Sequence, residues 1–348
     1  MLPIVIVGVA IALVAGWIAF HEDTGGAASS ETGACDAAAV ARNVLPSIVT
    51  VQTATSEGGG NGSGQVVRPD GYVLTNYHVV SSAAAAGDTG SVAVRYTDGT
   101  RSPATIVGLD PTTDLAVIKA EDRAAGRPVV QIGSSGDLVV GQPVVALGAP
   151  LGLTSTVTHG IVSALDRYLP LDVGGGQTAH LVDAVQTDAS INPGNSGGAL
   201  VDCAGRLIGV NSAIITAPNA AGQSGGGSIG LGFAIPSDLA DPIAEQLITT
   251  GQANHPTFGL QALPLIGPSG GSTGLFVSVV DPGGPAEQAG LQVGDLITVV
   301  DGSPARNVSQ LEKIALLREP GDSVKVTVVR DGSPTETAIV LGNPAAGN

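Results

Sequence analysis

The chain has 348 residues, which is long enough for two domains of ordinary size, and 43% of them are hydrophobic, which is enough for packed cores. Its 30 acidic and 14 basic residues give a formal net charge of −16. Nucleic acid and acidic lipid surfaces attract basic proteins, so this balance argues against both as partners. We therefore expect the chain to bind no nucleic acid.

The first segment of the chain, residues 4–20, is apolar and carries no charge. As a helix it would span about 25 Å, at the short end for a membrane-spanning helix, with Trp17 and Phe20 near an interface. A cleaved signal peptide is the alternative, although no Lys or Arg precedes the run and no small-residue cleavage site ends it. We favour a retained transmembrane anchor over residues 1–20, followed by a flexible linker rich in small residues over 21–38.

The chain contains two cysteines, Cys35 shortly after the apolar segment and Cys203 far along the chain. An even number of cysteines in an exported protein permits one disulfide, and two unpaired thiols are the alternative. Neither cysteine lies in a metal-binding or redox motif. We therefore predict a possible disulfide between Cys35 and Cys203, no metal site and no cofactor.

From Val40 to Ile235 the chain alternates short β-branched runs with Gly, Pro, Asp and Asn. These runs lie at residues 48–52, 64–67, 73–75, 92–96, 104–108, 115–119, 144–147, 157–162, 184–187, 199–201, 207–212 and 232–235. Many short strands without intervening helices predict an all-β barrel architecture. We expect two six-stranded barrels, with the break between them near residues 133–141.

The C-terminal part of the chain changes pattern. Residues 237–250 predict a helix, because Ser237 can cap its start and Gly251 directly follows its end. A hinge-like linker leads to a second module, which alternates strands with a short helix and with a longer helix capped by Asn307. The predicted strands of this module lie at 274–280, 293–302, 324–330 and 337–341. The pattern indicates a small α+β domain.

Ser196 is the strongest candidate for a reactive side chain, because Gly194, Gly197 and Gly198 surround it. Glycine allows positive φ and the close approach of a substrate. A serine is a poor nucleophile unless a base accepts its proton and backbone N–H groups hold the oxyanion that forms on the attacked carbonyl. The turn can direct the N–H groups of Gly194 and Ser196 at one point, with that of Asn195 nearby, as an oxyanion hole.

His78 and Asp114 are the candidate base and its orienting carboxylate. His78 follows one strand-like run, and Asp114 begins another. The order His78, Asp114, Ser196 is that of chymotrypsin, and it differs from the orders of subtilisin and the α/β-hydrolases. The α/β-hydrolase alternative needs alternating strands and helices and a histidine after Ser196, yet the only later histidine is His255, in a Pro-flanked linker.

Several segments resemble the HtrA family of serine proteases with a C-terminal PDZ domain. These segments are Thr75–Val80, Asp110–Lys119, Gly148–Gly152, Thr158–Ser163, Gln186–Leu200, Gly232–Pro236 and, in the second module, Pro285–Asp295. The resemblance implies a chymotrypsin-like double β-barrel protease domain over residues 39–251 and a PDZ domain over 257–343. His78 and Asp114 would then belong to the first barrel and Ser196 to the second, with the site between them.

The resemblance also implies what the protein does. It implies a membrane-anchored serine endopeptidase that cleaves unfolded or damaged proteins and assembles as a homo-oligomer, commonly a trimer. Residues 4–20 would make it a single-pass protein of the cell membrane with both domains on the extracytoplasmic side. Two alternatives stay open, a catalytically silent membrane-anchored scaffold that binds peptides through its PDZ domain, and an esterase.

The residues expected to shape the substrate pocket are apolar. No acidic residue lies at the expected base of the pocket near Ser190, so cleavage after Lys or Arg is not expected. Asp188 is expected to bind backbone groups rather than substrate. Ile191, Leu231 and Phe233 would form a modest pocket suited to Val, Ala, Ile or Leu at the cleaved residue.

The PDZ domain is expected to take a peptide C-terminus as an added strand, and so to regulate the protease. Backbone N–H groups around Phe258, Gly259 and Leu260 would receive the terminal carboxylate. The helix that follows Asn307 would supply apolar contacts to the peptide side chains.

Overall fold

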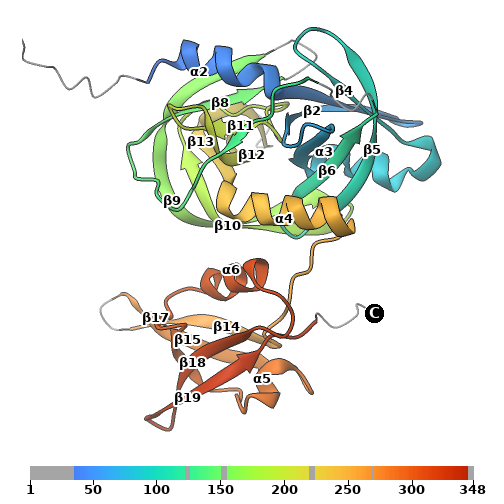
Figure 1. The fold of residues 1–348 in the computed structure, drawn as a ribbon. Helices are drawn as coiled ribbons and strands as arrows, with labels where there is room; N and C mark the ends of the chain where they lie inside the picture. Colours follow the sequence, from blue (N-terminus) through green and yellow to red (C-terminus); the bar gives the residue numbers. More distant parts are fainter. Residues whose placement is uncertain (1–34, 122–125, 150–154, 219–223, 268–269, 344–348) are drawn as a thin grey trace, which may run out of the picture. The chain divides into compact units, whose positions relative to one another are not determined.

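The computed structural model describes residues 35–121, 126–149, 155–218, 224–267 and 270–343. The predicted anchor over residues 1–20 and most of the predicted linker over 21–38 lie outside these ranges. Within the described ranges, no helix is both long enough and apolar enough to cross a membrane. The described residues form two β-rich domains, which the segment 251–257 joins (Figure 1).

The first domain opens with a closed six-stranded barrel in the order β1-β2-β3-β6-β5-β4. Its strands are β1 (Ile48–Thr55), β2 (Gly58–Val66), β3 (Tyr72–Asn76), β4 (Ser91–Arg95), β5 (Arg101–Asp110) and β6 (Leu115–Ala120). β-branched side chains on the inner face fill the barrel, and Val51, Val73, Val94 and Ile118 are all fully buried. The predicted first barrel is confirmed.

A second ring of six strands follows in the order β11-β8-β9-β10-β13-β12, and β11 pairs with both β8 and β12, which closes the ring. Its strands are β8 (Pro143–Gly148), β9 (Thr156–Gly174), β10 (Gln177–Thr187), β11 (Ala199–Val201), β12 (Arg206–Pro218) and β13 (Ser224–Pro236). The short β7 (Gln131–Ile132) pairs in parallel with β12. The prediction of two barrels is confirmed, but the change between them lies before β7, earlier than the expected residues 133–141.

Helices occur where the sequence predicted strands alone. α2 (Ala37–Val44) begins inside the predicted linker 21–38, and α3 (Tyr77–Ala85) directly follows β3. α3 buries Val79, Val80 and Ala83 in the core of the first barrel, and its alanine-rich second half favours a helix. The expectation of strands without helices was wrong here, because one buried helical face in so short a segment leaves little periodic signal. As a result His78 lies in the first turn of a helix.

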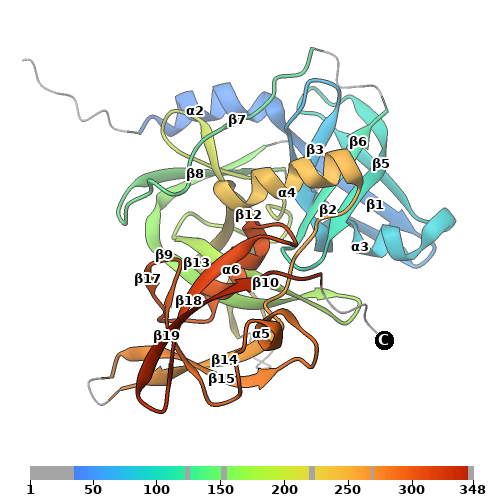
Figure 2. The ribbon, with the colours of Figure 1, turned by 60° about the horizontal axis from the view of Figure 1, so that its bottom comes forward.

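α4 (Ser237–Thr250) has the bounds that the sequence predicted. It packs against β5, β6 and β12, and lies along the first domain in both ribbon views (Figures 1 and 2). Gly251 ends it in the left-handed region, at φ 77°, with its N–H donating to the carbonyl of Leu247.

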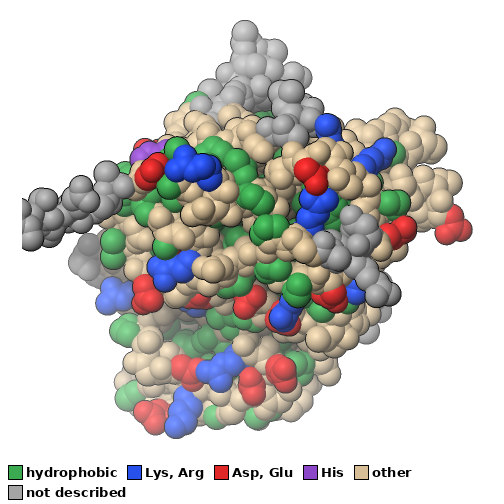
Figure 3. Space-filling view, turned by 45° about the horizontal axis from the view of Figure 1, so that its top comes forward, with side chains coloured by type: hydrophobic (Ala, Val, Ile, Leu, Met, Phe, Trp, Pro, Cys, Tyr) green, Lys and Arg blue, Asp and Glu red, His purple; other side chains and the backbone are tan. Residues whose placement is uncertain are grey.

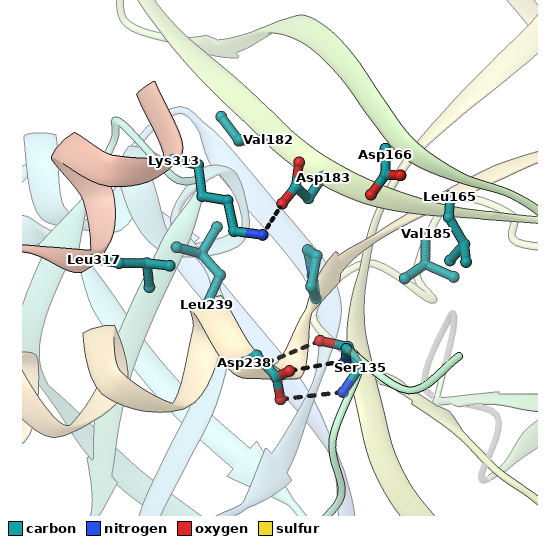
Figure 4. Close-up of a pocket in the computed structure, with 12 residues that line it drawn as sticks. Ser135, Leu165, Asp166, Val182, Asp183, Val185, Asp238, Leu239, Lys313 and Leu317 are labelled. Carbon is teal, nitrogen blue, oxygen red and sulfur yellow. Dashed lines mark hydrogen bonds and ion pairs between the residues drawn. The ribbon is translucent and has the colours of Figure 1, made fainter. Parts of the chain in front are cut away.

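The start of α4 differs from the prediction. The hydroxyl of Ser237 does not cap the helix, because it donates to the carbonyl of Gly133 at 2.8 Å. The carboxylate of Asp238, in the first turn, accepts the N–H groups of Ser135 at 3.1 Å and Gly136 at 2.8 Å (Figure 4). These bonds tie α4 to the segment between β7 and β8.

The second domain is a small α+β domain built on one sheet in the order β14-β15-β16-β18-β19. Its elements are β14 (Leu260–Ile266), β15 (Ser272–Val280), α5 (Pro285–Gln288), β16 (Leu296–Val300), β17 (Ser303–Pro304), α6 (Ser309–Leu317), β18 (Ser323–Arg330) and β19 (Ser333–Val340). One hydrophobic cluster joins the sheet to both helices through Leu275, Ala286 and Leu311. Asn307 Oδ1 accepts the N–H of Gln310, so Asn307 caps α6 as predicted.

The acidic excess of the chain is not gathered into one patch on the face drawn in Figure 3, where acidic and basic side chains are interspersed. Some acidic side chains are paired with basic ones, as Asp98 is with Arg127.

A buried carboxylate connects β18 to the start of β16 in the second domain. Asp295, which is 1% exposed, accepts hydrogen bonds from Arg330 Nε at 2.7 Å, from Arg330 Nη2 at 2.8 Å and from the N–H of Gln292 at 2.8 Å. The Arg330 side chain, helped by the Gln292 N–H, holds the pKa of Asp295 below its ordinary value although burial opposes this. The ionised carboxylate therefore stabilises the folded domain.

We predict that Asp295→Asn destabilises the second domain at pH 7. A depressed folded-state pKa means that the stabilisation is present above the unfolded-state pKa of about 3.9 and is lost as pH falls through the folded-state pKa. Urea unfolding between pH 7 and pH 2.5 should show a lower midpoint for the variant than for the wild type at neutral pH. The difference between the two midpoints should narrow below pH 4. Asp331→Asn, which changes the neighbouring exposed carboxylate, is the control. Equal losses in the two variants, or a gap independent of pH, would contradict this role.

Candidate active site

Asp114 lies in the turn between β5 and β6, with its backbone in the left-handed region at φ 59° and its side chain fully buried. Its carboxylate accepts the backbone N–H of His78 at 3.0 Å, the Nδ1–H of the His78 ring at 2.9 Å and the hydroxyl of Ser212 at 2.6 Å. Its own carbonyl accepts Asn76 Nδ2 at 2.8 Å and the N–H of Tyr77 at 3.0 Å. Burying a carboxylate is costly unless it is hydrogen-bonded, and these donors meet that need.

His78 presents a defined tautomer. A carboxylate can only accept, so the contact with Asp114 puts the ring proton on Nδ1 and leaves Nε2 as an acceptor. The side chain of His78 is 29% exposed, whereas that of Asp114 is not exposed at all. The ring is therefore partly exposed and presents Nε2 as an acceptor, while its Nδ1 is bound to a buried carboxylate.

Ser196 lies on the segment between β10 and β11, and its hydroxyl donates to the carbonyl of Ser212 at 3.2 Å. Ser212, on β12, donates its own hydroxyl to Asp114. One residue thus contacts both Ser196 and Asp114. Together with the His78 contact, this brings the three sequence-predicted catalytic residues to one site.

A glycine lets the Ser196 segment reach the first barrel. Gly197 has φ 80°, and a Cβ there would lie 2.2 Å from the carbonyl oxygen of Ser63 and 2.4 Å from Thr75 Oγ1. Any side chain would collide with these atoms. The glycine therefore places Ser196 against the end of β3, just before His78.

The predicted oxyanion-hole residues differ in what their N–H groups do. The N–H of Asn195 donates to the carbonyl of Asn192 at 2.9 Å, so it is engaged inside the turn. Across the parts of the chain that the structure describes, the N–H groups of Gly194 and Ser196 donate to no protein acceptor. Gly194 and Ser196 are thus the donors available to a substrate oxyanion.

Sequence reasoning missed two residues of the site, Ser212 and Asn76. Asn76 is fully buried and Ser212 is 5% exposed, and each donates to Asp114. Asn76 precedes His78 by two residues, but nothing in that spacing shows that its amide reaches the Asp114 carbonyl. Ser212 lies far from Asp114 in the sequence, and only the packing of the two barrels brings them together.

The three predicted pocket residues do not form one cluster. Ile191, which is 1% exposed, belongs to the core of the second barrel, and a Cβ on Gly232 would lie 2.9 Å from its Cδ1. Phe233 belongs to a different cluster, shared by both barrels and α4, and Leu231 packs against that cluster. Successive residues of a strand point to opposite faces, so Leu231 and Phe233 share a face of β13 that Gly232 does not.

Two further polar residues have partners away from Ser196. Asp188 Oδ1 accepts the N–H of Ile161 at 2.7 Å, in line with the backbone-binding role expected of it. His255 Nε2 lies 2.8 Å from Asp110 Oδ2. His255 is therefore engaged elsewhere, and the arrangement does not support an α/β-hydrolase site.

The residues expected to receive a peptide carboxylate lie at the start of β14. Phe258 is buried in the core of the second domain, and Gly259 has φ 67° with Pro285 only 2.7 Å from the position of a Cβ. The N–H of Gly259 donates to Thr257 Oγ1 at 3.0 Å, so it is already engaged. A groove of about 270 Å³ separates β14 from α6. Its apolar lining includes Leu260, Ala262, Val308, Leu311 and Ala315.

Comparisons with known protein families agree with this division of the chain. A family model described as a trypsin-like peptidase domain matches residues 62–210, and a PDZ domain model matches residues 251–329.

Curated relatives cover most of the chain. Serine protease PepD of Mycobacterium tuberculosis is 43% identical over 291 residues, which is 83% of this chain and 62% of that protein. The periplasmic pH-dependent serine endoprotease DegQ of Escherichia coli is 38% identical over 289 residues, or 81% of this chain and 59% of that protein. The chain thus spans less than two thirds of the length of these relatives.

Solved structures match over nearly their full length. The HtrA-type protease AlgW, solved with a tripeptide, has a TM-score of 0.73 and 34% identity, covering 90% of this chain and 98% of that one. A serine endoprotease from Yersinia pestis has a TM-score of 0.64 and 33% identity, covering 89% and 98%. With both domain models matched in order, the chain belongs to the HtrA family of serine proteases, with one trypsin-like peptidase domain followed by one PDZ domain.

Proposed function

We propose that the chain is an active serine endopeptidase in which Ser196 is the nucleophile, His78 the general base and Asp114 its orienting carboxylate. The observation that carries the proposal is the set of hydrogen bonds that runs from Ser196 through Ser212 to Asp114 and His78. His78 Nε2 takes the hydroxyl proton as Ser196 Oγ attacks the scissile carbonyl carbon, and then gives that proton to the leaving amine. Asp114 keeps Nδ1 protonated and stabilises the imidazolium that forms.

The N–H groups of Gly194 and Ser196 donate hydrogen bonds to the attacked carbonyl oxygen and stabilise the negative charge that develops on it. Such donors act strongly because they are aligned before the reaction and need not reorganise. Asn195, whose N–H is engaged with Asn192, contributes by shaping the turn rather than by donating.

A catalytically silent scaffold is the competing function, and two features of Asp114 favour the enzyme. Its carboxylate is fully buried, and its backbone holds a left-handed conformation. The left-handed backbone costs stability, and the buried carboxylate is tolerated only because several donors pair with it; features of this kind concentrate at functional sites. A scaffold that only binds peptides at its PDZ groove would have no use for either.

We predict that Ser196→Ala abolishes both casein hydrolysis and labelling by a fluorophosphonate, because the attacking oxygen is gone. Asp114→Asn should lower kcat by roughly 10⁴-fold, since an amide can donate to His78 and so favour the wrong tautomer. Ser91→Ala and Asp88→Asn change exposed residues of the first domain and should keep wild-type rates. A wild-type protein that neither labels nor cleaves any polypeptide would instead favour the scaffold.

We further propose that cleavage follows small or medium aliphatic residues. Ser190, at the expected base of the pocket, carries no charge, and the neighbouring Asp188 already accepts the N–H of Ile161. Ile191, whose Cδ1 would lie 2.9 Å from a Cβ on Gly232, is a buried apolar neighbour of this segment. Among the described residues around Ser190 no carboxylate is thus left to receive a Lys or Arg side chain, so we expect an aliphatic side chain to be preferred.

Ser190→Asp should raise cleavage after Arg and Lys relative to Val by roughly tenfold or more, because a charge-assisted hydrogen bond contributes about 1.5–3 kcal/mol. Ser190→Asn is the matched control, since it has nearly the same shape without the charge. A peptide library digested by each protein gives the ratios. A wild-type preference for Arg, or the same change in both variants, would disagree with the proposed pocket.

The substrates we propose are unfolded or damaged proteins, with peptide C-termini at the PDZ groove regulating their cleavage. The apolar groove between β14 and α6 supports this, because an added strand beside β14 would place alternate side chains over Leu311 and Ala315. Phe258, Gly259 and Leu260 remain the proposed carboxylate site, although the Gly259 N–H already has a partner. The AlgW structures are described as complexes with a tripeptide and with a decapeptide.

Filling the groove with Ala315→Trp should weaken binding of a fluorescent peptide that ends in a free apolar residue by at least roughly tenfold, since its side-chain site is lost. The same peptide should lose its effect on casein hydrolysis. Thr335→Trp, on the exposed part of β19, adds the same side chain outside the groove and serves as the control. Equal binding by both variants, or full binding of a C-terminally amidated peptide to the wild type, would argue for another site.

We propose that residues 4–20 anchor the chain in the cell membrane as a single pass, with both domains outside the cytoplasm, and that the chain assembles as a trimer. Several relatives carry the word periplasmic in their names, which supports the location. We also propose that Cys35 and Cys203, the two cysteines of the sequence, pair as a disulfide, which is supported by the absence of a free cysteine among the described residues. A disulfide suits an oxidising compartment.

A further inference from the structure

We propose that Ser63 is a positioning residue that holds the oxyanion hole in its working shape. The proposal rests on the proposed function, because it concerns the same site. Ser63 lies on β2, in the first barrel, and it is fully buried. It touches no reacting atom, so any effect on catalysis must pass through the residues that it binds.

The hydroxyl of Ser63 makes two hydrogen bonds, one as an acceptor and one as a donor. Its oxygen accepts the N–H of Ala149, just after β8, at 2.8 Å. Its proton is donated to the carbonyl of Gly194 at 2.6 Å. The bond to Ala149 is buried and the bond to Gly194 is partly buried, so both are shielded from bulk water to a different degree. Ser63 thus joins two segments of the second barrel through one hydroxyl group.

The first of these contacts orients a peptide plane in the oxyanion loop. The carbonyl of Gly194 and the N–H of Asn195 belong to the same planar group. Ser63 holds the carbonyl end, and the carbonyl of Asn192 holds the N–H end at 2.9 Å. Gly194 has φ 99° and no Cβ to restrict rotation, so side-chain sterics alone would not fix this plane. The hydroxyl of Ser63 supplies the missing restraint.

The backbone of Ser63 orients a second plane. Its N–H donates to the carbonyl of Ser196 at 2.8 Å, and the N–H at the other end of that plane, from Gly197, donates to the carbonyl of Asn211 at 2.8 Å. The two planes that Ser63 holds lie on either side of the plane that carries the Ser196 N–H. Gly194 and Ser196 are thereby kept in the turn that leaves both donors available.

Ser63 also connects the two halves of the site. Its carbonyl accepts Thr75 Oγ1 at 2.7 Å, and Thr75 precedes His78 by three residues on the same stretch of chain. The residue therefore binds the segment that leads to the base and the turn that holds the oxyanion. A change of the Ser63 side chain should act through Gly194 and Ala149 alone, because the contacts with Ser196 and Thr75 are made by the Ser63 backbone.

The test is steady-state kinetics on Ser63→Ala. We expect kcat to fall roughly 10- to 100-fold, less than for loss of a direct donor, with little change in KM. Affinity for a peptide boronate, which forms a tetrahedral adduct on Ser196, should fall by a similar factor. The kinetic pKa of the base should stay at the wild-type value, because the contacts between His78 and Asp114 are untouched.

Ser47→Ala is the matched control. Ser47 is also a buried serine, and its hydroxyl donates to a carbonyl, that of Val44, at 2.7 Å, away from the site. It should lose stability without losing kcat or boronate affinity. Ser63→Cys replaces the hydroxyl with a somewhat larger thiol that donates weakly, and it is the variant to test if Ser63→Ala does not fold. It should show the same losses.

Wild-type kcat and boronate affinity in a folded Ser63 variant would overturn the inference. So would a loss accompanied by a shifted kinetic pKa, which would place the defect at His78. If neither variant folds, Ser63 is a structural residue and the inference is rejected. These results are read against a wild-type protein that cleaves casein and a Ser196→Ala protein that does not. An inactive wild type would instead reject the proposed function, and this inference with it.

Discussion

The buried carboxylate of Asp114 is the constraint around which the first domain arranges its active site. Its donors come from the start of α3, from the His78 ring and from Ser212 of the second barrel. The first N–H groups of a helix have no partner within the helix, and Asp114 takes one of them. One side chain therefore both caps α3 and fixes the tautomer of His78. Loss of any donor would leave a buried charged group underpaired, which is costly.

The position of Ser196 depends on close contact between the two barrels. A Cβ on Gly197 would lie 2.2 Å from the Ser63 carbonyl oxygen, and a Cβ on Gly198 would lie 2.2 Å from the carbonyl oxygen of Leu147. Gly197 is thus required by the packing of one barrel on the other and Gly198 by packing within the second barrel, in addition to any need of the substrate. The glycines of this segment are therefore explained by close packing as well as by chemistry. This explains why a residue of β2, Ser63, can reach the oxyanion turn.

Strand alternation and helix-ending signals predicted much of the fold. The two barrels, the bounds of α4 and the small α+β domain followed from local patterns, because buried strands and Gly-terminated helices leave those patterns in the sequence. α3 was missed because only three of its side chains are buried. The capping role given to Ser237 failed because Gly133, distant in the sequence, accepts its hydroxyl proton instead. Local rules fail where a distant partner competes.

The sequence by itself determined the reactive groups, namely an imidazole, a carboxylate and a hydroxyl in the order of chymotrypsin, with glycines around the hydroxyl. The tertiary structure alone decided which donors surround Asp114, and that Ile191 and Phe233 belong to different clusters. It also decided that Ser63 holds the turn around Ser196. The reason is physical. Residue types and their spacing show which chemistry is available, whereas hydrogen bonds between distant segments depend on how the strands pair and how the barrels pack.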